Sequence, residues 1–233
     1  SNETRVQAAL RTPPPKPKHT TLGRFFGVYS DPRAYLGMAY MLLALATGIF
    51  YFTFAVTGLS LSAGFAILII GIPFFLLFIG TTRVLALAEG RIVETLLGTR
   101  MPRRPVHPGP PMGWMQRVLE MLKDPRTWGT LLYLLLMLPL GLFYFTFVIV
   151  GIVCSLALTI APIVVLLYHA GVISIDGTVE SPHPALLPLV SILGIVLLTV
   201  TLHLSRGIGY LHGQLAKSLL VRAPRTADEP AVA

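Results

Sequence analysis

Charged residues are scarce in this chain, and its long apolar runs contain none. Only 12% of the 233 residues are Asp, Glu, Lys or Arg, whereas 54% are hydrophobic. Three runs, 34–82, 127–175 and 185–205, lack charged residues entirely. Because ionisable groups inside a membrane usually mark ion or proton pathways, this absence argues against a pump or coupled transporter. Runs of this length predict transmembrane helices, each of which needs about 20 apolar residues.

The motifs of enzymes and metal sites are also missing. The sequence contains no Walker loop, GxSxG elbow, HExxH, GxGxxG or paired carboxylates. The single cysteine, Cys154, excludes an internal disulfide, and no CxxC or His/Cys cluster predicts a structural metal. We therefore expect no catalytic residue, no metal and no cofactor.

Positive charge is plentiful but confined to the ends of the apolar runs. The formal net charge is +8, and all 18 Lys and Arg lie in 1–33, 83–126 or 206–225. Basic residues on one side of the spans follow the positive-inside rule and attract anionic lipid headgroups. No nucleic-acid-binding pattern accompanies the charge. We expect the lipid bilayer as a partner, no nucleic acid, and both termini in the cytoplasm.

One 28-residue segment occurs twice, 93 positions apart and without a gap. The copies are 31–58 and 124–151, and 14 of their positions are identical, including DPR at the start and FYFTF near the end. Such a duplication indicates two versions of one structural unit. The sequence predicts an all-α integral membrane protein of two pseudo-repeated helical hairpins.

Each copy opens with a helix-start signal. Asp31 and Asp124 suit the N-cap, and the prolines that follow suit the first helical position. We expect helices over about 34–57 and 127–150, with FYFTF near the opposite membrane interface, where aromatic residues concentrate. In the first repeat the chain turns at 58–64 and returns over 61–82.

A second correspondence lies at the ends of the two repeats. Residues 82–97 align with 205–220 at an offset of 123, so the second repeat carries about 30 extra residues near 152–183. Both segments have apolar residues at helical spacing and predict amphipathic cytoplasmic helices. If 152–170 crossed the membrane, the basic segment 206–225 would lie outside. We therefore predict four spans, with 152–170 as a re-entrant or outer-leaflet segment broken near Pro162.

These boundaries divide the chain into five parts. They are a flexible basic, proline-rich tail (1–30), repeat 1 (31–98), a cytoplasmic linker (99–123), repeat 2 (124–222) and a disordered tail (223–233).

The assembled pattern resembles a known family, the membrane-embedded sensor domain of bacterial two-component histidine kinases, above all those of actinobacteria. The resemblance rests on the DPR openings, the stretch RVLALAEGRIVETLLG at 83–98 and the pair Ala161-Pro162. It implies a module of the bacterial inner membrane. Only eight residues follow Arg225, so we expect no kinase domain and a signal passed to a partner protein.

The repeated aromatic segment is the candidate for recognition. Two copies could line an outer-leaflet pocket for a lipid or apolar compound, or simply form an aromatic belt. The hydroxyls of Tyr51 and Tyr144 could orient a ligand. The pocket candidates are Phe50, Tyr51, Phe52, Phe54, Phe143, Tyr144, Phe145 and Phe147. Four glycines would permit close helix packing beside them, namely Gly48, Gly58, Gly141 and Gly151.

The amphipathic segments either lie in the headgroup plane or dock a partner helix. The docking candidates are Arg83, Glu89, Arg91, Arg206, His212 and Lys217. The predicted function is a non-enzymatic, sensor-like membrane module that acts through a protein partner or a homo-oligomer. A structural accessory subunit of a respiratory or transport complex is the alternative. A haem carrier using His169 and His203 is a weaker one, because the topology places these histidines on opposite faces.

Overall fold

The computed structural model describes residues 21–66, 71–101, 113–174 and 183–221. Within these ranges the protein is all-α and has no strand. The predicted tail 1–20, the linker residues 102–112 and the tail 222–233 lie outside the described residues.

Four long helices are apolar enough to cross a membrane. They are α3 (Pro32–Phe65), α4 (Gly71–Leu97), α6 (Pro125–His169) and α7 (Leu187–Leu220). Shorter elements precede them, namely α2 (Thr21–Phe26), η1 (Gly27–Ser30), α5 (Trp114–Lys123) and η2 (Pro184–Leu186). The prediction of an all-α, multi-pass membrane protein with four spans is confirmed.

The two DPR motifs begin helices as expected. Oδ1 of Asp31 accepts a hydrogen bond from the backbone N–H of Arg33, and Oδ1 of Asp124 accepts one from that of Arg126, both at 3.0 Å. A proline occupies the first turn of each helix. Each carboxylate thus satisfies an N–H group that has no partner within the helix.

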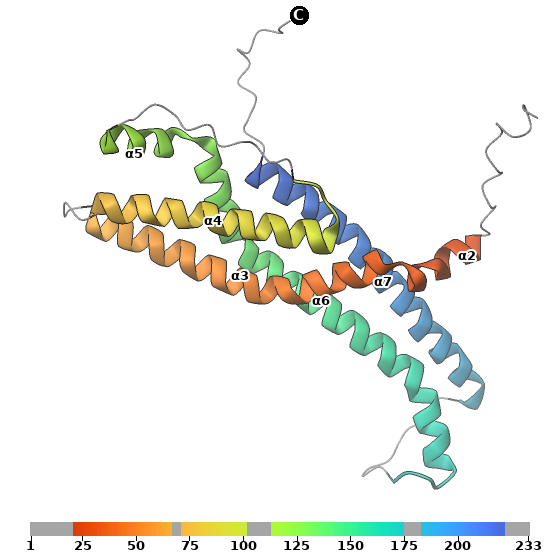
Figure 1. Cartoon of the computed structure of the whole chain (residues 1–233). Coiled ribbons are helices and arrows are strands. Elements are labelled where there is room, and N and C mark those ends of the chain that lie inside the picture. The colour runs from red at the N-terminus through yellow and green to blue at the C-terminus, as the bar shows by residue number, and fades with distance from the viewer. Residues whose placement is uncertain (1–20, 67–70, 102–112, 175–182, 222–233) are drawn as a thin grey trace, which may run out of the picture.

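Helices α3 and α6 cross each other at two glycines (Figure 1). A Cβ atom at Gly48 would collide with the carbonyl oxygen of Met137, and one at Gly141 would collide with that of Ala44. Met137 and Ala44 are themselves 93 positions apart, as the two glycines are, so the two contacts are equivalent. The absence of side chains at Gly48 and Gly141 lets the two helix backbones touch.

Each crossing helix forms a hairpin with the helix that follows it. Gly58 of α3 lies against the ring of Phe78 on α4, and Gly151 of α6 lies against the side chain of Thr201 on α7. The second hairpin is longer, and α6 and α7 extend together beyond the crossing (Figure 1). At 1.5 Å per residue, α6 measures about 68 Å.

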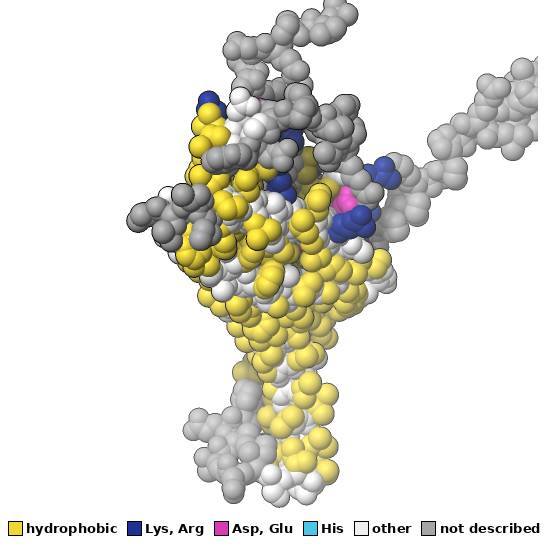
Figure 2. All heavy atoms as spheres, turned by 60° about the vertical axis from the view of Figure 1, so that its left-hand side comes forward, with side chains coloured by type: hydrophobic (Ala, Val, Ile, Leu, Met, Phe, Trp, Pro, Cys, Tyr) yellow, Lys and Arg dark blue, Asp and Glu magenta, His cyan; other side chains and the backbone are white. Residues whose placement is uncertain are grey.

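Ion pairs connect the start of each repeat with the return helix of the other. Asp31 pairs with Arg206 at 2.8 Å, and Asp124 pairs with Arg83 at 3.4 Å. The face in Figure 2 carries its charged side chains toward one end, whereas hydrophobic side chains cover the tapering remainder. This separation of charge from apolar surface is what a membrane-embedded protein requires.

The predicted break near Pro162 is wrong. Helix α6 continues without interruption from Pro125 to His169, with Pro139 and Pro162 inside it. Proline removes one helical hydrogen bond, but neighbouring helices can compensate in an apolar setting. One turn before Pro162, Ser191 of α7 donates a hydrogen bond to the carbonyl oxygen of Thr159, 3.1 Å away, and so ties α6 to α7.

Two other predicted boundaries differ from the structure. Helix α3 runs through the expected turn at 58–64 and ends only at Phe65. Residues 21–30, expected to belong to a flexible tail, form α2 and η1 and contact α7. The hydroxyl of Tyr29 lies 3.0 Å from Oγ1 of Thr199, and Val28 is buried.

Candidate functional site

Six polar side chains meet in the core where the four long helices converge. We call them the polar cluster; they are Tyr40 and Tyr51 of α3, Glu89 of α4, Tyr133 and Tyr144 of α6, and His212 of α7. None is more than 6% exposed. Among the described residues, most side-chain hydrogen bonds between these four helices lie in the polar cluster, and we take it as the candidate site.

The carboxylate of Glu89 accepts three hydrogen bonds from tyrosine hydroxyls. Oε1 accepts from Tyr40 at 2.6 Å and from Tyr133 at 2.9 Å, and Oε2 accepts from Tyr51 at 3.0 Å. Burying a carboxylate is expensive unless it is hydrogen-bonded. Three donors from two helices provide that compensation, so Glu89 depends on α3 and α6 together.

The imidazole of His212 is held by the same tyrosines and by a fourth. Nε2 lies 2.6 Å from the hydroxyl of Tyr40 and 3.0 Å from that of Tyr133. Nδ1 lies 3.0 Å from the hydroxyl of Tyr144. Tyr40 and Tyr133 therefore bridge the carboxylate of α4 and the imidazole of α7.

One assignment of protons uses every donor in the polar cluster. The three tyrosines around Glu89 donate to its carboxylate, N–H at Nε2 of His212 donates to the oxygens of Tyr40 and Tyr133, and Tyr144 donates to Nδ1. In this state the cluster carries one negative charge. A proton added at Nδ1 would neutralise the cluster and reverse the hydrogen bond between His212 and Tyr144.

The polar cluster has matching members from the two repeats. Tyr40 matches Tyr133 and Tyr51 matches Tyr144 at the offset of 93, and Glu89 matches His212 at the offset of 123. Matching residues make matching contacts, except that an acid stands in one half and a base in the other. The two halves have therefore diverged at the position that carries the charge.

Apolar packing surrounds the polar cluster. Met41, Val93, Leu134 and Met137 are fully buried in the same core as the tyrosines. In such a low-dielectric setting an unpaired polar atom is costly, so the hydrogen bonds favour one arrangement of the helices over others.

The repeated FYFTF segments do not lie at the far end of the hairpins, contrary to the expectation of an opposite interface. Tyr51 bonds Glu89 and Gly58 contacts Phe78, so the antiparallel register of α3 and α4 places this segment beside Arg83. In the second repeat, the contact of Gly151 with Thr201 likewise places Phe147 near the level of Arg206.

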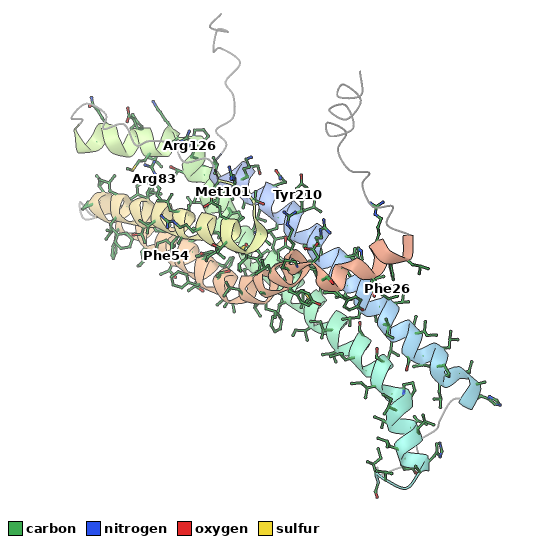
Figure 3. The ribbon with its side chains drawn as sticks, turned by 45° about the vertical axis from the view of Figure 1, so that its right-hand side comes forward. Phe26, Phe54, Arg83, Met101, Arg126 and Tyr210 are labelled. Atoms are coloured by element: carbon green, nitrogen blue, oxygen red, sulfur yellow. The ribbon has the colours of Figure 1, made fainter. Side chains whose placement is uncertain are left out.

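The eight aromatic candidates are divided between core and surface. Tyr51 and Tyr144 have their hydroxyls in the polar cluster, so they do not orient a ligand in an outer pocket. Phe50 and Phe143 are 57% and 58% exposed on the apolar exterior. The remaining four are half-buried, namely Phe52, Phe54, Phe145 and Phe147. Phe54 lies against Phe78, with 5.4 Å between ring centroids (Figure 3).

For two of the predicted docking residues, the prediction of an exposed position is wrong. Glu89 and His212 are 0% and 1% exposed, so neither can meet a partner protein. Arg91 and Lys217 are exposed on α4 and α7. Arg83 and Arg206 are half-exposed and form the ion pairs with Asp124 and Asp31.

The histidines considered for haem lie apart from the polar cluster. His169 ends α6, whereas His203 is exposed on α7, where it stacks on Phe25. Within the described residues, no three His, Cys, Asp or Glu side chains gather where they could hold a metal ion. Cys154 is exposed on α6.

Comparison with known proteins identifies the family. No curated protein and no solved structure matches the chain. A family model described as "Putative sensor" matches residues 40–220, which include all six members of the polar cluster. Because this match covers most of the chain, the protein belongs to the "Putative sensor" family.

Proposed function

We propose that this chain is a non-enzymatic membrane sensor module that responds to a membrane or envelope cue and passes the signal to a partner protein. The family supports the sensor role. The observation that carries the mechanism is the polar cluster, because it joins residues from all four long helices. The two hairpins cannot move relative to each other without changing these hydrogen bonds.

The polar cluster gives the module a resting arrangement with a discrete alternative. Its hydrogen bonds favour one packing of the helices, and a cue that binds another packing more tightly shifts the population. Loss of the hydrogen bond between Tyr144 and His212 would loosen the contact of α7 with α6. The signal then takes the form of a displacement between α4 and α7.

The output surface is formed by the ends of α4 and α7 beyond the polar cluster. Arg91 and Lys217 are exposed there, and both helices end within a few residues. We place these ends and both termini in the cytoplasm of a bacterial inner membrane, supported by the charge distribution and the positive-inside rule.

Photo-crosslinking in intact cells tests this proposal. A photoreactive amino acid replaces Arg91 or Lys217, and Leu142, which is 57% exposed on the apolar face of α6, serves as the control position. We expect the same protein to be crosslinked from positions 91 and 217 but not from 142. In a Glu89→Leu background the yield should change at least about twofold, because the polar cluster sets the packing of α4 and α7.

Two outcomes would contradict the proposal. One is a yield that is identical with and without Glu89→Leu, since the partner would then be insensitive to the polar cluster. The other is a partner crosslinked chiefly through position 142, which would instead favour an accessory subunit packed along its membrane face.

A further inference from the structure

A pocket of about 460 Å³ opens beside the polar cluster. Arg33 and Gly37 of α3 form one wall, the end of α4 at Leu96 and Leu97 forms another, and α7 contributes a face from His203 to Tyr210. None of these residues belongs to the polar cluster or to the aromatic segments. The pocket is large enough for a phosphorylated headgroup.

The pocket carries a net positive charge. Arg33 and Arg206 contribute two guanidinium groups, and only Arg206 has an acidic partner, Asp31 at 2.8 Å. Among the described residues the guanidinium of Arg33 has no partner, and Asp31 uses its other oxygen to cap α3. A guanidinium has five N–H donors, so Arg206 keeps several for a ligand. The planar donors of arginine match the oxygens of a phosphate.

Two further polar groups line the same pocket. The ring of His203 is fixed by stacking on Phe25 and by a 2.9 Å contact between Nδ1 and the carbonyl oxygen of Thr199. That contact assigns N–H to Nδ1 and leaves Nε2 as an acceptor, which can receive a hydrogen bond from a hydroxyl of a headgroup rather than from a phosphate oxygen. The hydroxyl of Tyr210 makes no hydrogen bond within the described residues, and Tyr210 is 63% exposed on α7 (Figure 3). Arginine, histidine and tyrosine groups thus meet around one space.

The matching positions of the other half share only part of the lining of this pocket. The two arginines are retained there as Arg126 and Arg83. The other lining positions differ, because Gly37, His203, Gly207, Gly209 and Tyr210 match Thr130, Gly80, Val84, Ala86 and Leu87. Around the equivalent pairs of arginines, the half with Arg33 and Arg206 thus has glycines where the other half has larger side chains, and Tyr210 where the other half has a leucine.

From this convergence we propose that the pocket of Arg33, His203, Arg206 and Tyr210 binds a phosphate group, carried by an anionic phospholipid headgroup or by a free phosphate. The apolar side chains of Leu96 and Leu97 in its wall suit the lipid source, because they can contact the glycerol and upper acyl chain. The site is separate from the aromatic segments considered for a lipid in the sequence.

The pocket adjoins the polar cluster through its floor. The Cβ position of Gly209 lies 3.1 Å from Cδ2 of Leu97 and 3.8 Å from Cα of Gly37. Three residues further along, these two helices carry His212 and Tyr40. A phosphate that draws Arg33 and Arg206 together therefore acts on the same α3–α7 contact that the polar cluster holds. This coupling rests on the proposed function, whereas binding of phosphate does not.

Native mass spectrometry of the full chain in detergent tests the site directly. The probes are dioctanoyl-phosphatidylglycerol, dioctanoylglycerol, which lacks the phosphate, and inorganic phosphate. We expect one phosphatidylglycerol per chain and no comparable binding of dioctanoylglycerol. Arg33→Gln should weaken binding roughly tenfold, because it removes a charge-assisted contact. The matched variant Arg126→Gln, at the equivalent position of the other half, should leave binding unchanged.

A second variant keeps the test valid if the arginine changes disturb folding. A Cβ atom at Gly207 meets no atom within 4 Å, so Gly207→Val is tolerated by the fold but places bulk in the pocket, as Val84 does in the other half. This variant should lose binding while its thermal midpoint stays unchanged. Inorganic phosphate that binds with the same response to Gly207→Val would support the site and assign a free phosphate as its source.

Two results would overturn the proposal. Equal binding by wild type, Arg33→Gln and Gly207→Val would show that the pocket is not the site. An equal loss in Arg33→Gln and Arg126→Gln would show diffuse attraction to basic residues. Neither result bears on whether the polar cluster controls a partner, which the crosslinking experiment tests separately.

Discussion

At the scale of single residues, Glu89 and His212 decide how the core is organised. Both are ionisable side chains on helices that bury no other ionisable group within the described residues, and both are almost fully buried. Each is stable there only because tyrosines from α3 and α6 reach it. The four hydroxyls therefore do more than fill space, because the loss of any one removes a hydrogen bond from the buried carboxylate, from the buried imidazole, or from both.

Removal of a single hydroxyl tests this requirement. Tyr51→Phe leaves Oε2 of Glu89 without its donor, and Tyr144→Phe leaves Nδ1 of His212 without its partner. We expect each change to lower the free energy of unfolding by about 1–2 kcal/mol, seen as a lower thermal midpoint in detergent. Tyr210→Phe removes a hydroxyl without a hydrogen bond among the described residues and should have almost no effect. Equal midpoints for all three variants would contradict the role given to the polar cluster.

The spacing of apolar residues around Glu89 indicates that it is buried, although its charge suggests an exposed position. Glu89 lies four residues after Leu85 and four before Val93, so it shares their helix face. The offset of 123 also pairs it with His212. Glu89 was predicted to lie on an exposed docking surface only because it is a charged residue type. What no local pattern contains is the approach of Tyr40 and Tyr133 from separate helices, because that depends on where α3 and α6 cross.

At the scale of helices, the crossing of α3 and α6 determines which side chains can meet. Contact between the two backbones at Gly48 and Gly141 lets the hydroxyls of the four tyrosines converge on Glu89 and His212 from both sides of the crossing. Small residues permit such approaches in membrane proteins, where packing rather than hydrophobicity drives helix association.

Alanine substitution at the crossing should separate the helices. Gly48→Ala or Gly141→Ala places a methyl group against a backbone carbonyl that cannot rotate away, so we expect a loss of about 2 kcal/mol and a lower thermal midpoint. The control is Gly80→Ala in α4, where a Cβ meets nothing within 4 Å. There alanine should stabilise the helix by up to about 1 kcal/mol. The same sign of change at both positions would argue against the backbone contact.

The helices themselves could be predicted well, and their ends less well. Uncharged runs predicted four spans, and the DPR motifs predicted the starts of α3 and α6. The continuity of α6 through Pro162 was not predicted, because a proline inside a helical pattern usually indicates a break or kink and the packing of α7 beside it is not visible in the local sequence. The position of FYFTF along the hairpin was predicted wrongly, because the register of α3 and α4, fixed by Tyr51 with Glu89 and Gly58 with Phe78, places the Phe54 end of the segment at the level of Arg83.

At the scale of the whole molecule, the two halves share one plan, and besides the longer second hairpin they differ at two sites. Ion pairs, glycine contacts and tyrosines occur in matching sets. The differences are the acid and base within the polar cluster and the pocket around Arg33 and Arg206. A symmetric frame with these two unequal elements is suited to convert binding on one side into relative movement of its hairpins.

The central claim is that the polar cluster holds the two hairpins in one arrangement. Pulsed electron–electron double resonance in lipid nanodiscs tests it most directly. Spin labels replace Leu87 of α4 and Leu211 of α7, which are 72% and 66% exposed, and Cys154→Ser removes the native cysteine. Wild type should give one narrow distance distribution, and Glu89→Leu should add a second population. The matched change Glu94→Leu, outside the polar cluster, should leave the distribution narrow. A Glu89→Leu distribution identical to that of wild type would contradict the account.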